Sequence, residues 1–193
     1  MENIIIRKAI ENDRKALAQV CAHAFQHDWS IVSENSNIVA HALGSGINIE
    51  AYLVATIDNE IAGFLSYVTG NQRAQMIHIK NFQKAAGFFK GYAIAMMIKK
   101  EFEEPLHFNE NQVYIDILGI EPKFHHLGIA TQLIQYLIQN TDFTEYILKV
   151  TTINVHAIEC YKKNGFVEYK REKVKYPKQM GFDAYIYMKR NKQ

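Results

Sequence analysis

The stretch that decides the fold of this chain is Ile120-Glu121-Pro122-Lys123-Phe124-His125-His126-Leu127-Gly128-Ile129-Ala130. An apolar run precedes it at 113–120 and an amphipathic run follows it at 131–139, which predicts a strand, a tight loop and a helix. The first turn of a helix leaves its backbone N–H groups unpaired, and with the helix dipole these groups favour a phosphate. Gly128 lets a ligand approach the backbone closely, and Ala130 keeps the next contact small. The sequence therefore predicts a pocket for the pyrophosphate of a cofactor.

This loop differs from the best-known phosphate-binding loops, because it has neither a Gly-Lys-Ser/Thr ending nor the three-glycine dinucleotide fingerprint. It resembles motif A of the GNAT superfamily of N-acetyltransferases, Arg/Gln-x-x-Gly-x-Gly/Ala after a Val-x-Pro-like strand end. Ile120-Glu121-Pro122 matches the strand end, and His125-x-x-Gly128-x-Ala130 matches the loop. His125 stands in place of the usual Arg or Gln, and His126 where many members carry a second Gly. The plain alternative is an ordinary strand-to-helix turn that contains a Gly.

A second motif follows a strand-like run at 146–150. It is Asn154-Val155-His156-Ala157-Ile158-Glu159-Cys160-Tyr161-Lys162-Lys163-Asn164-Gly165-Phe166. This segment resembles motif B of the same superfamily in its Asn, Ala, Tyr and Gly-Phe positions. Ala157 and Tyr161 lie four residues apart and so share a helix face, and Asn164-Gly165 is a good helix stop. Two motifs in the right order support each other.

The resemblance implies a bacterial-type, single N-acetyltransferase domain over 1–193, of the α/β (α+β) class. A mixed, mostly antiparallel sheet flanked by helices should open into a V-shaped cofactor cleft. Strands are expected near 3–8, 51–57, 61–69, 113–119, 146–151, 166–173 and 183–189, and Asp58-Asn59-Glu60 indicates a hairpin. Helices are expected from about 11 to 25, at 36–43 and in both motifs. A helical insertion is expected at about 71–110. It should hold one helix, 82–103, which Pro105 ends. This helix is interpreted as a packed helix, a lid or a dimer contact.

The resemblance also implies the co-substrate, acetyl-coenzyme A, and the residues that hold it. The pyrophosphate is expected on the loop and helix start, at His125, His126, Leu127, Gly128, Ile129, Ala130 and Thr131. A bulge in the central strand should let the backbone of Leu118, Gly119 and Ile120 pair with the pantetheine amides and polarise the thioester. Asn154 is expected to bond the pantetheine arm, to cap the motif B helix, or both.

Two side chains are candidates for the chemistry. In the family, the Tyr that matches Tyr161 lies near the sulfur and can protonate the leaving thiolate; the alternative is a Tyr that packs on the sheet. Asp116 is a charge in an apolar strand, and period-two alternation places Tyr114, Asp116 and Leu118 on one face. It is interpreted as a base, as an anchor for the acceptor's ammonium, or as a buried ion pair without a catalytic role.

The resulting hypothesis is N-acetyl transfer from acetyl-coenzyme A to a primary amine by direct attack in a ternary complex. A Cys160 acyl-enzyme is the enzymatic rival, and a catalytically idle coenzyme A sensor or scaffold is the non-enzymatic one. The acceptor is left open as a small molecule or a protein amine, and a homodimer is possible.

Composition and charge limit the classes of partner that this chain is expected to bind. The net charge is +2 and dispersed, which gives no case for nucleic acid, and the apolar run at 85–98 is shorter than the ~20 residues of a membrane span. No metal is expected, because adjacent His125 and His126 seldom converge on one ion. His23 and His27 are interpreted as solvated surface, and Cys21 and Cys160 as small buried hydrophobes. Met1-Glu2-Asn3 lacks the features of a signal peptide, so a cytoplasmic location is expected.

Overall fold

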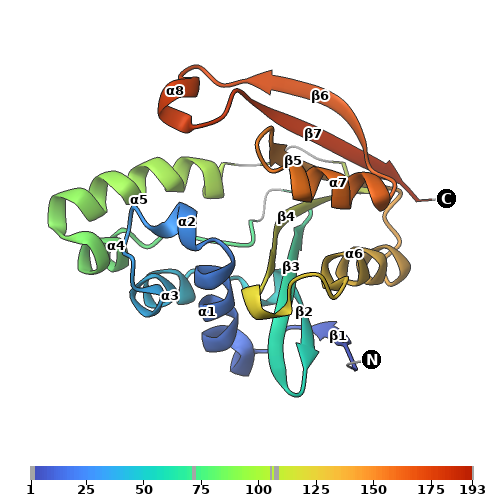
Figure 1. The fold of residues 1–193 in the computed structure, drawn as a ribbon, viewed down its shortest axis with the longest axis horizontal. Coiled ribbons are helices and arrows are strands. Elements are labelled where there is room, and N and C mark those ends of the chain that lie inside the picture. Colours follow the sequence, from blue (N-terminus) through green and yellow to red (C-terminus); the bar gives the residue numbers. More distant parts are fainter. Residues whose placement is uncertain (1–2, 71–72, 105, 107–108, 193) are drawn as a thin grey trace.

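A seven-stranded sheet in the order β1-β2-β3-β4-β5-β7-β6 forms the centre of the molecule (Figure 1). The computed structural model describes residues 3–70, 73–104, 106 and 109–192. The strands are β1 (Ile5–Lys8), β2 (Tyr52–Ile57), β3 (Glu60–Val68), β4 (Gln112–Ile120), β5 (Glu145–Thr151), β6 (Val167–Lys173) and β7 (Ala184–Asn191). β4 and β5 run parallel, whereas the other neighbours are antiparallel. The expected mixed, mostly antiparallel sheet is confirmed.

Helices cover both faces of this sheet. They are α1 (Arg14–Ala24), α2 (Gln26–Trp29), α3 (Ser36–Gly44), α4 (Ile79–Ala86), α5 (Phe88–Glu103), α6 (Ile129–Gln139), α7 (Val155–Lys163) and α8 (Pro177–Met180). Figure 1 shows α1 to α5 on one side and α6 on the other. Among the described residues, no helix has both the length and the apolar run that a membrane crossing requires.

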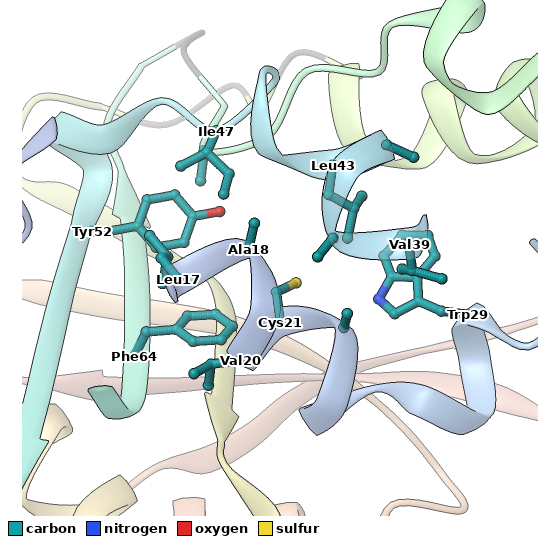
Figure 2. Close-up of a cluster of buried hydrophobic side chains, with 14 of the residues drawn as sticks. Leu17, Ala18, Val20, Cys21, Trp29, Val39, Leu43, Ile47, Tyr52 and Phe64 are labelled. Carbon is teal, nitrogen blue, oxygen red and sulfur yellow. The ribbon is translucent and has the colours of Figure 1, made fainter. Parts of the chain in front are cut away.

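Two apolar clusters fill the space between helices and sheet. The first joins α1, α2 and α3 to one face of the sheet, where Cys21 lies between Leu17, Trp29 and Tyr52 (Figure 2). Burial raises the pKa of the Cys21 thiol to about 12, as suits an inert core residue. Trp29 is a core residue and stacks on Phe102 at 6.1 Å between ring centroids. The second cluster joins α6 and α7 to the opposite face.

The predicted hairpin between β2 and β3 is present. Asp58 and Asn59 have φ values of 48° and 66°, so both central residues of the turn are left-handed. Asp and Asn tolerate this conformation, which matches the twist of a two-residue hairpin.

The insertion holds two helices where the sequence predicted one. α4 and α5 are separated by Gly87, whose φ of 89° and ψ of 158° are open essentially to glycine alone. Gly91 lets α5 cross α4 closely, because an added Cβ would lie 2.2 Å from the Phe82 carbonyl oxygen. The prediction of a continuous 82–103 helix is therefore wrong: apolar periodicity runs through Gly87, but the backbone turns there. Pro105, the expected helix end, lies outside the described residues.

Candidate active site

The parallel strands β4 and β5 separate part-way along their length. Their pairing joins 112–115 to 145–148 and stops there, although β4 continues to Ile120 and β5 to Thr151. Two antiparallel partners hold the separated halves in place, β3 beside β4 and β7 beside β5. The sheet therefore opens into a V between β4 and β5, with its vertex after Ile115 and Leu148.

A bulge in β4 lies at this vertex. The register with β3 shifts at Ser66 and Tyr67, which pair with Ile117 and Ile115, so Asp116 is the extra residue. The Ser66 hydroxyl fills the irregularity, since it accepts from the Ile117 N–H at 2.9 Å and donates to the Ile117 carbonyl at 3.3 Å. The bulge was expected near Gly119 and is found earlier in the strand.

The bulge also corrects the predicted alternation of β4. Tyr114 belongs to the cluster under α1 and α3, and Ile117 packs against it, whereas Leu118 packs on the cluster under α6. Tyr114 and Leu118 therefore lie on opposite faces, and the prediction that Tyr114, Asp116 and Leu118 share one face is wrong. One inserted residue shifts a period of two by one position.

Beyond the bulge, β4 directs alternate N–H groups into the V. The N–H groups of Ile117 and Glu121 donate toward β3, to Ser66 Oγ and to the Ala62 carbonyl at 2.9 Å each. By alternation, the N–H groups of Leu118 and Ile120 face the open side, where no strand pairs with them.

Gly119, the third predicted backbone contact, faces the other way. Its polar groups are turned toward β3, opposite Phe64. An added Cβ would lie 2.8 Å from the Phe64 ring and 3.1 Å from Ala24 Cβ. Gly119 therefore serves the close packing of α1 on the sheet rather than the open edge of β4.

The loop after β4 forms the predicted cradle of backbone donors. His126 and Gly128 have φ values of 66° and 76°, and Gly128 is the N-cap of α6. In the described part of the chain, the N–H groups of His126 to Thr131 have no acceptor within hydrogen-bond distance. The loop residues are exposed, and a Cβ added at Gly128 would meet no atom within 4 Å. Unpaired donors at the positive end of a helix fit a pyrophosphate.

His125 lies at the edge of this cradle. Its side chain is exposed, and Nε2 lies 3.3 Å from the carbonyl oxygen of Ile120. The His125 and His126 rings meet edge to face, with centroids 6.2 Å apart. Across the described ranges, no three His, Cys, Asp or Glu side chains gather in a group that could hold a metal ion.

The motif B segment forms α7, and its Asn154 caps the helix. The Asn154 side chain accepts from the Ala157 N–H at 3.2 Å, which confirms the predicted cap. Asn154 is exposed, so its amide nitrogen is accessible.

Tyr161 extends from α7 into the cluster under α6, with its ring 6.0 Å from that of Phe166. None of the described residues bonds its hydroxyl. Burial raises the pKa of the Tyr161 phenol well above its ordinary value, and neighbouring Cys160 adds to the rise. Burial disfavours the phenolate, so the group keeps its proton and remains a donor.

Asn164 is a positioning residue that sequence reasoning treated only as a helix stop. It is buried, donates to Thr131 Oγ1 at 3.1 Å and to the Cys160 carbonyl at 2.9 Å, and accepts from Gln135 at 2.9 Å. It thus ties the start of α6 to the end of α7, and fixes the phosphate cradle relative to Tyr161. The Cys160 sulfur lies in this same contact, 3.8 Å from the Asn164 amide.

Asp116 forms a buried ion pair with Arg73. The guanidinium lies 2.8 Å and 3.2 Å from the two carboxylate oxygens, and the Ala74 N–H donates to one of them at 3.3 Å. The side chains of Arg73 and Asp116 are 9% and 4% exposed, respectively. Of the roles weighed for Asp116, this geometry matches the buried ion pair.

His23 was interpreted as solvated surface but is bonded on both ring nitrogens. Nδ1 lies 2.9 Å and 3.1 Å from the Glu121 carboxylate oxygens, and Nε2 lies 3.2 Å from Ser36 Oγ. The pair holds α1 against the end of β4, so the first interpretation is wrong for His23. His27 is exposed, as expected.

Comparisons with known proteins agree with this geometry. Residues 22–166 match the Acetyltransferase (GNAT) family. Among curated proteins, no significant match is found.

Solved structures of low sequence identity share the fold. The ribosomal-protein-S18-alanine N-acetyltransferase from Escherichia coli superposes with a TM-score of 0.60 at 13% identity, over 99% of this chain and 95% of that one. An N-acetyltransferase from Staphylococcus aureus Mu50 gives 0.61 at 16% identity, over 96% and 100% of the two chains. A GNAT-family acetyltransferase from Bacillus cereus ATCC 10987 gives 0.60 at 16%, over 99% of each. Because the family match covers well over half of the sequence, this chain belongs to the GNAT family of acetyltransferases and is an acyltransferase.

Proposed function

We propose that this enzyme moves an acetyl group from acetyl-coenzyme A to a primary amine by direct attack in a ternary complex. The observation that carries the proposal is the continuity of the site. The unpaired N–H groups of 126–131 lie where β4 leaves the V, and the free N–H groups of β4 lead from there toward the vertex. One extended ligand with a pyrophosphate at one end fits this path.

Each part of the site has a defined task in this proposal. The N–H groups of 126–131 bind the pyrophosphate, with His125 beside it. The N–H groups of Leu118 and Ile120 pair with the pantetheine amides, and the accessible amide of Asn154 lies on the opposite wall, at the start of α7. When bound, acetyl-coenzyme A supplies the acetyl group as an activated thioester.

Tyr161 is the proposed acid. As the C–N bond forms and the C–S bond breaks, the departing sulfur takes a proton from the phenol, because a free thiol has a pKa of about 8.5 and leaves less readily as an anion in a desolvated site. Because the pKa of Tyr161 is raised, the phenol is protonated at neutral pH and is available as a donor when the C–S bond breaks. The attacking amine releases its own proton to solvent, and solvent returns a proton to the Tyr161 phenolate, so the enzyme ends the cycle unchanged.

Asp116 takes a positioning role in this proposal. Both of its oxygens are occupied by Arg73, and Arg73 also donates to the carbonyls of Glu101 and Glu104 at the end of α5, at 3.0 Å and 2.8 Å. The pair therefore fixes the last turn of α5 over the vertex rather than accepting the amine's proton.

A binding and a turnover measurement test the proposal together. We expect calorimetry to detect coenzyme A binding, and release of the coenzyme A thiol to depend on an added amine in a panel of small amines and peptides. Cys160→Ala should retain turnover, since direct attack needs no thiol. Binding without turnover on any amine would favour the idle sensor, loss of turnover in folded Cys160→Ala would favour an acyl-enzyme, and absence of binding would reject the proposal.

A further inference from the structure

Lys149 stands at the vertex of the V, at the point that an acceptor must reach. It is the first residue of β5 beyond the last pair with β4, as Asp116 is for β4. Ile147, two residues earlier, belongs to the cluster under α1, so Lys149 lies on that same face of the sheet. This face is opposite to the one that α6 and α7 cover, and it is the side from which an amine can approach the thioester.

The ammonium of Lys149 occupies a site with the chemistry of a cation receptor. Its Nζ lies 4.4 Å from the centroid of the Tyr185 ring and 3.4 Å from Oε1 of Glu101. The Tyr185 hydroxyl donates to the same oxygen at 3.4 Å. An aromatic face next to a carboxylate is a favourable environment for an ammonium group.

The same arrangement recurs one step along β7. Lys170 Nζ lies 4.8 Å from the centroid of the Tyr187 ring and 3.1 Å from the Glu172 carboxylate, to which the Tyr187 hydroxyl donates at 3.2 Å. Tyr185 and Tyr187 are two residues apart on one strand, so their side chains lie on the same face of the sheet, with Cα atoms roughly 7 Å apart.

Both tyrosine hydroxyls lie beside a carboxylate and have raised pKa values. Burial, followed by the charge of Glu101, raises the pKa of Tyr185 to about 12, and burial followed by the charge of Glu172 raises that of Tyr187 to about 12. In this structure Lys149 balances the charge of Glu101 and Lys170 that of Glu172, while the Arg73 guanidinium is paired with Asp116.

We propose that this face binds the acceptor, and that the acceptor is an aliphatic diamine or polyamine whose ammonium groups take the places that Lys149 and Lys170 hold here. The assignment rests on the proposed function, because it supplies the second substrate of that reaction. The amine that takes the place of Lys149 at the vertex loses its proton before it attacks, and the other amine stays protonated on Tyr187 and Glu172. Lys149 is then a tethered competitor that the acceptor displaces.

Calorimetric titration with 1,4-diaminobutane tests this assignment through two variants of opposite effect. Glu101→Gln removes the carboxylate, and we expect the dissociation constant of the diamine to rise by about tenfold, the factor for a lost charge-assisted contact. Lys149→Met removes the competitor, and we expect the dissociation constant to fall several-fold. Glu50→Gln and Lys15→Met make the same charge changes at exposed positions with no partner among the described residues, and should leave it unchanged.

The opposite signs make the result decisive. Unchanged affinity in both variants, changes of the same sign, equal changes in the matched controls, or equally tight binding of butylamine would each overturn the assignment. Tyr185→Leu is the second variant if Glu101→Gln does not fold, and unaltered diamine affinity in it would likewise overturn the assignment.

The outcome is separable from that of the proposed function. Acetylation of some other amine, with no diamine binding, rejects the acceptor and leaves the transferase standing. Diamine binding with the expected signs, but without coenzyme A binding, rejects the transfer proposal and leaves the ammonium site standing.

Discussion

Arg73 and Asp116 form an ion pair that joins the bulge of β4 to the end of α5. The guanidinium lies 2.8 Å and 3.2 Å from the two Asp116 oxygens and also donates to the carbonyls of Glu101 and Glu104. Both side chains are nearly inaccessible to water. This one buried ion pair therefore joins the bulge of β4, at the vertex of the V, to the last turn of α5.

Asp116→Asn should destabilise the protein and leave the acidic limb of its pH–rate profile unchanged. The substitution leaves the Arg73 charge buried without a counter-ion, which typically costs ~3–5 kcal/mol. Chemical denaturation measures the loss, and turnover is measured below the unfolding midpoint. A changed acidic limb, with recovery of activity at high pH, would instead show that Asp116 is the base.

Tyr161→Phe should lower kcat and leave coenzyme A affinity intact. The ring and its packing on Phe166 are retained, and only the proton donor is removed. A lost general acid slows turnover within the range of ~10²–10⁴-fold. Steady-state kinetics with a good acceptor, together with calorimetry, separate the two effects; full activity would remove Tyr161 from the chemistry.

Gly128→Glu should abolish coenzyme A binding, because it places a carboxylate in the open cradle. Gly128→Ala is the matched control. Its Cβ meets no atom within 4 Å, but φ at 76° makes alanine strained by ~1–2 kcal/mol. We expect the alanine variant to lose stability and retain binding. Equal affinities in folded Gly128→Glu and wild type would disprove the cradle.

His125→Ala should weaken coenzyme A binding only modestly, by ~1 kcal/mol, the net worth of one hydrogen bond. The expectation follows from the unpaired N–H groups of 126–131, which supply most of the donors. Calorimetry on the folded variant tests it. A loss of several powers of ten would make the His125 side chain the main phosphate contact.

Asp13→Asn should reduce stability at neutral pH and flatten its decline in acid. The Arg7 guanidinium, 2.6 Å and 2.9 Å from the Asp13 oxygens, lowers the pKa of that carboxyl, and the Ile10 N–H adds to the effect. The folded pKa thus lies below the unfolded value of about 3.9, so the stabilisation is full above that pH and is lost as pH falls through the folded pKa. Urea unfolding from pH 6 to pH 2 measures it. Parallel pH profiles for variant and wild type would contradict the assignment.

Local sequence signals were sufficient for most of the elements and for the cradle. The strands and the helices of the two motifs lie within a few residues of their expected bounds, because periodicity and caps act over a single turn or pleat. Asn154 caps α7 with its own side-chain oxygen, and Gly128 can precede α6 because glycine readily adopts a positive φ. The single-turn helices α2 and α8 were missed, since four residues carry too little periodicity to be recognised.

The remaining features depend on partners that are distant in sequence. The bulge at Asp116 requires the Ser66 hydroxyl on another strand, and the break at Gly87 accompanies the close crossing of α5 over Phe82. Glu121 is adjacent to the most informative motif of the chain, yet its partner His23 is 98 residues away. A sequence specifies which side chains carry charge and which segments are extended or helical. Which charges become buried together is decided only when the sheet and helices pack, because the cost of an unpaired buried charge is set by the tertiary environment.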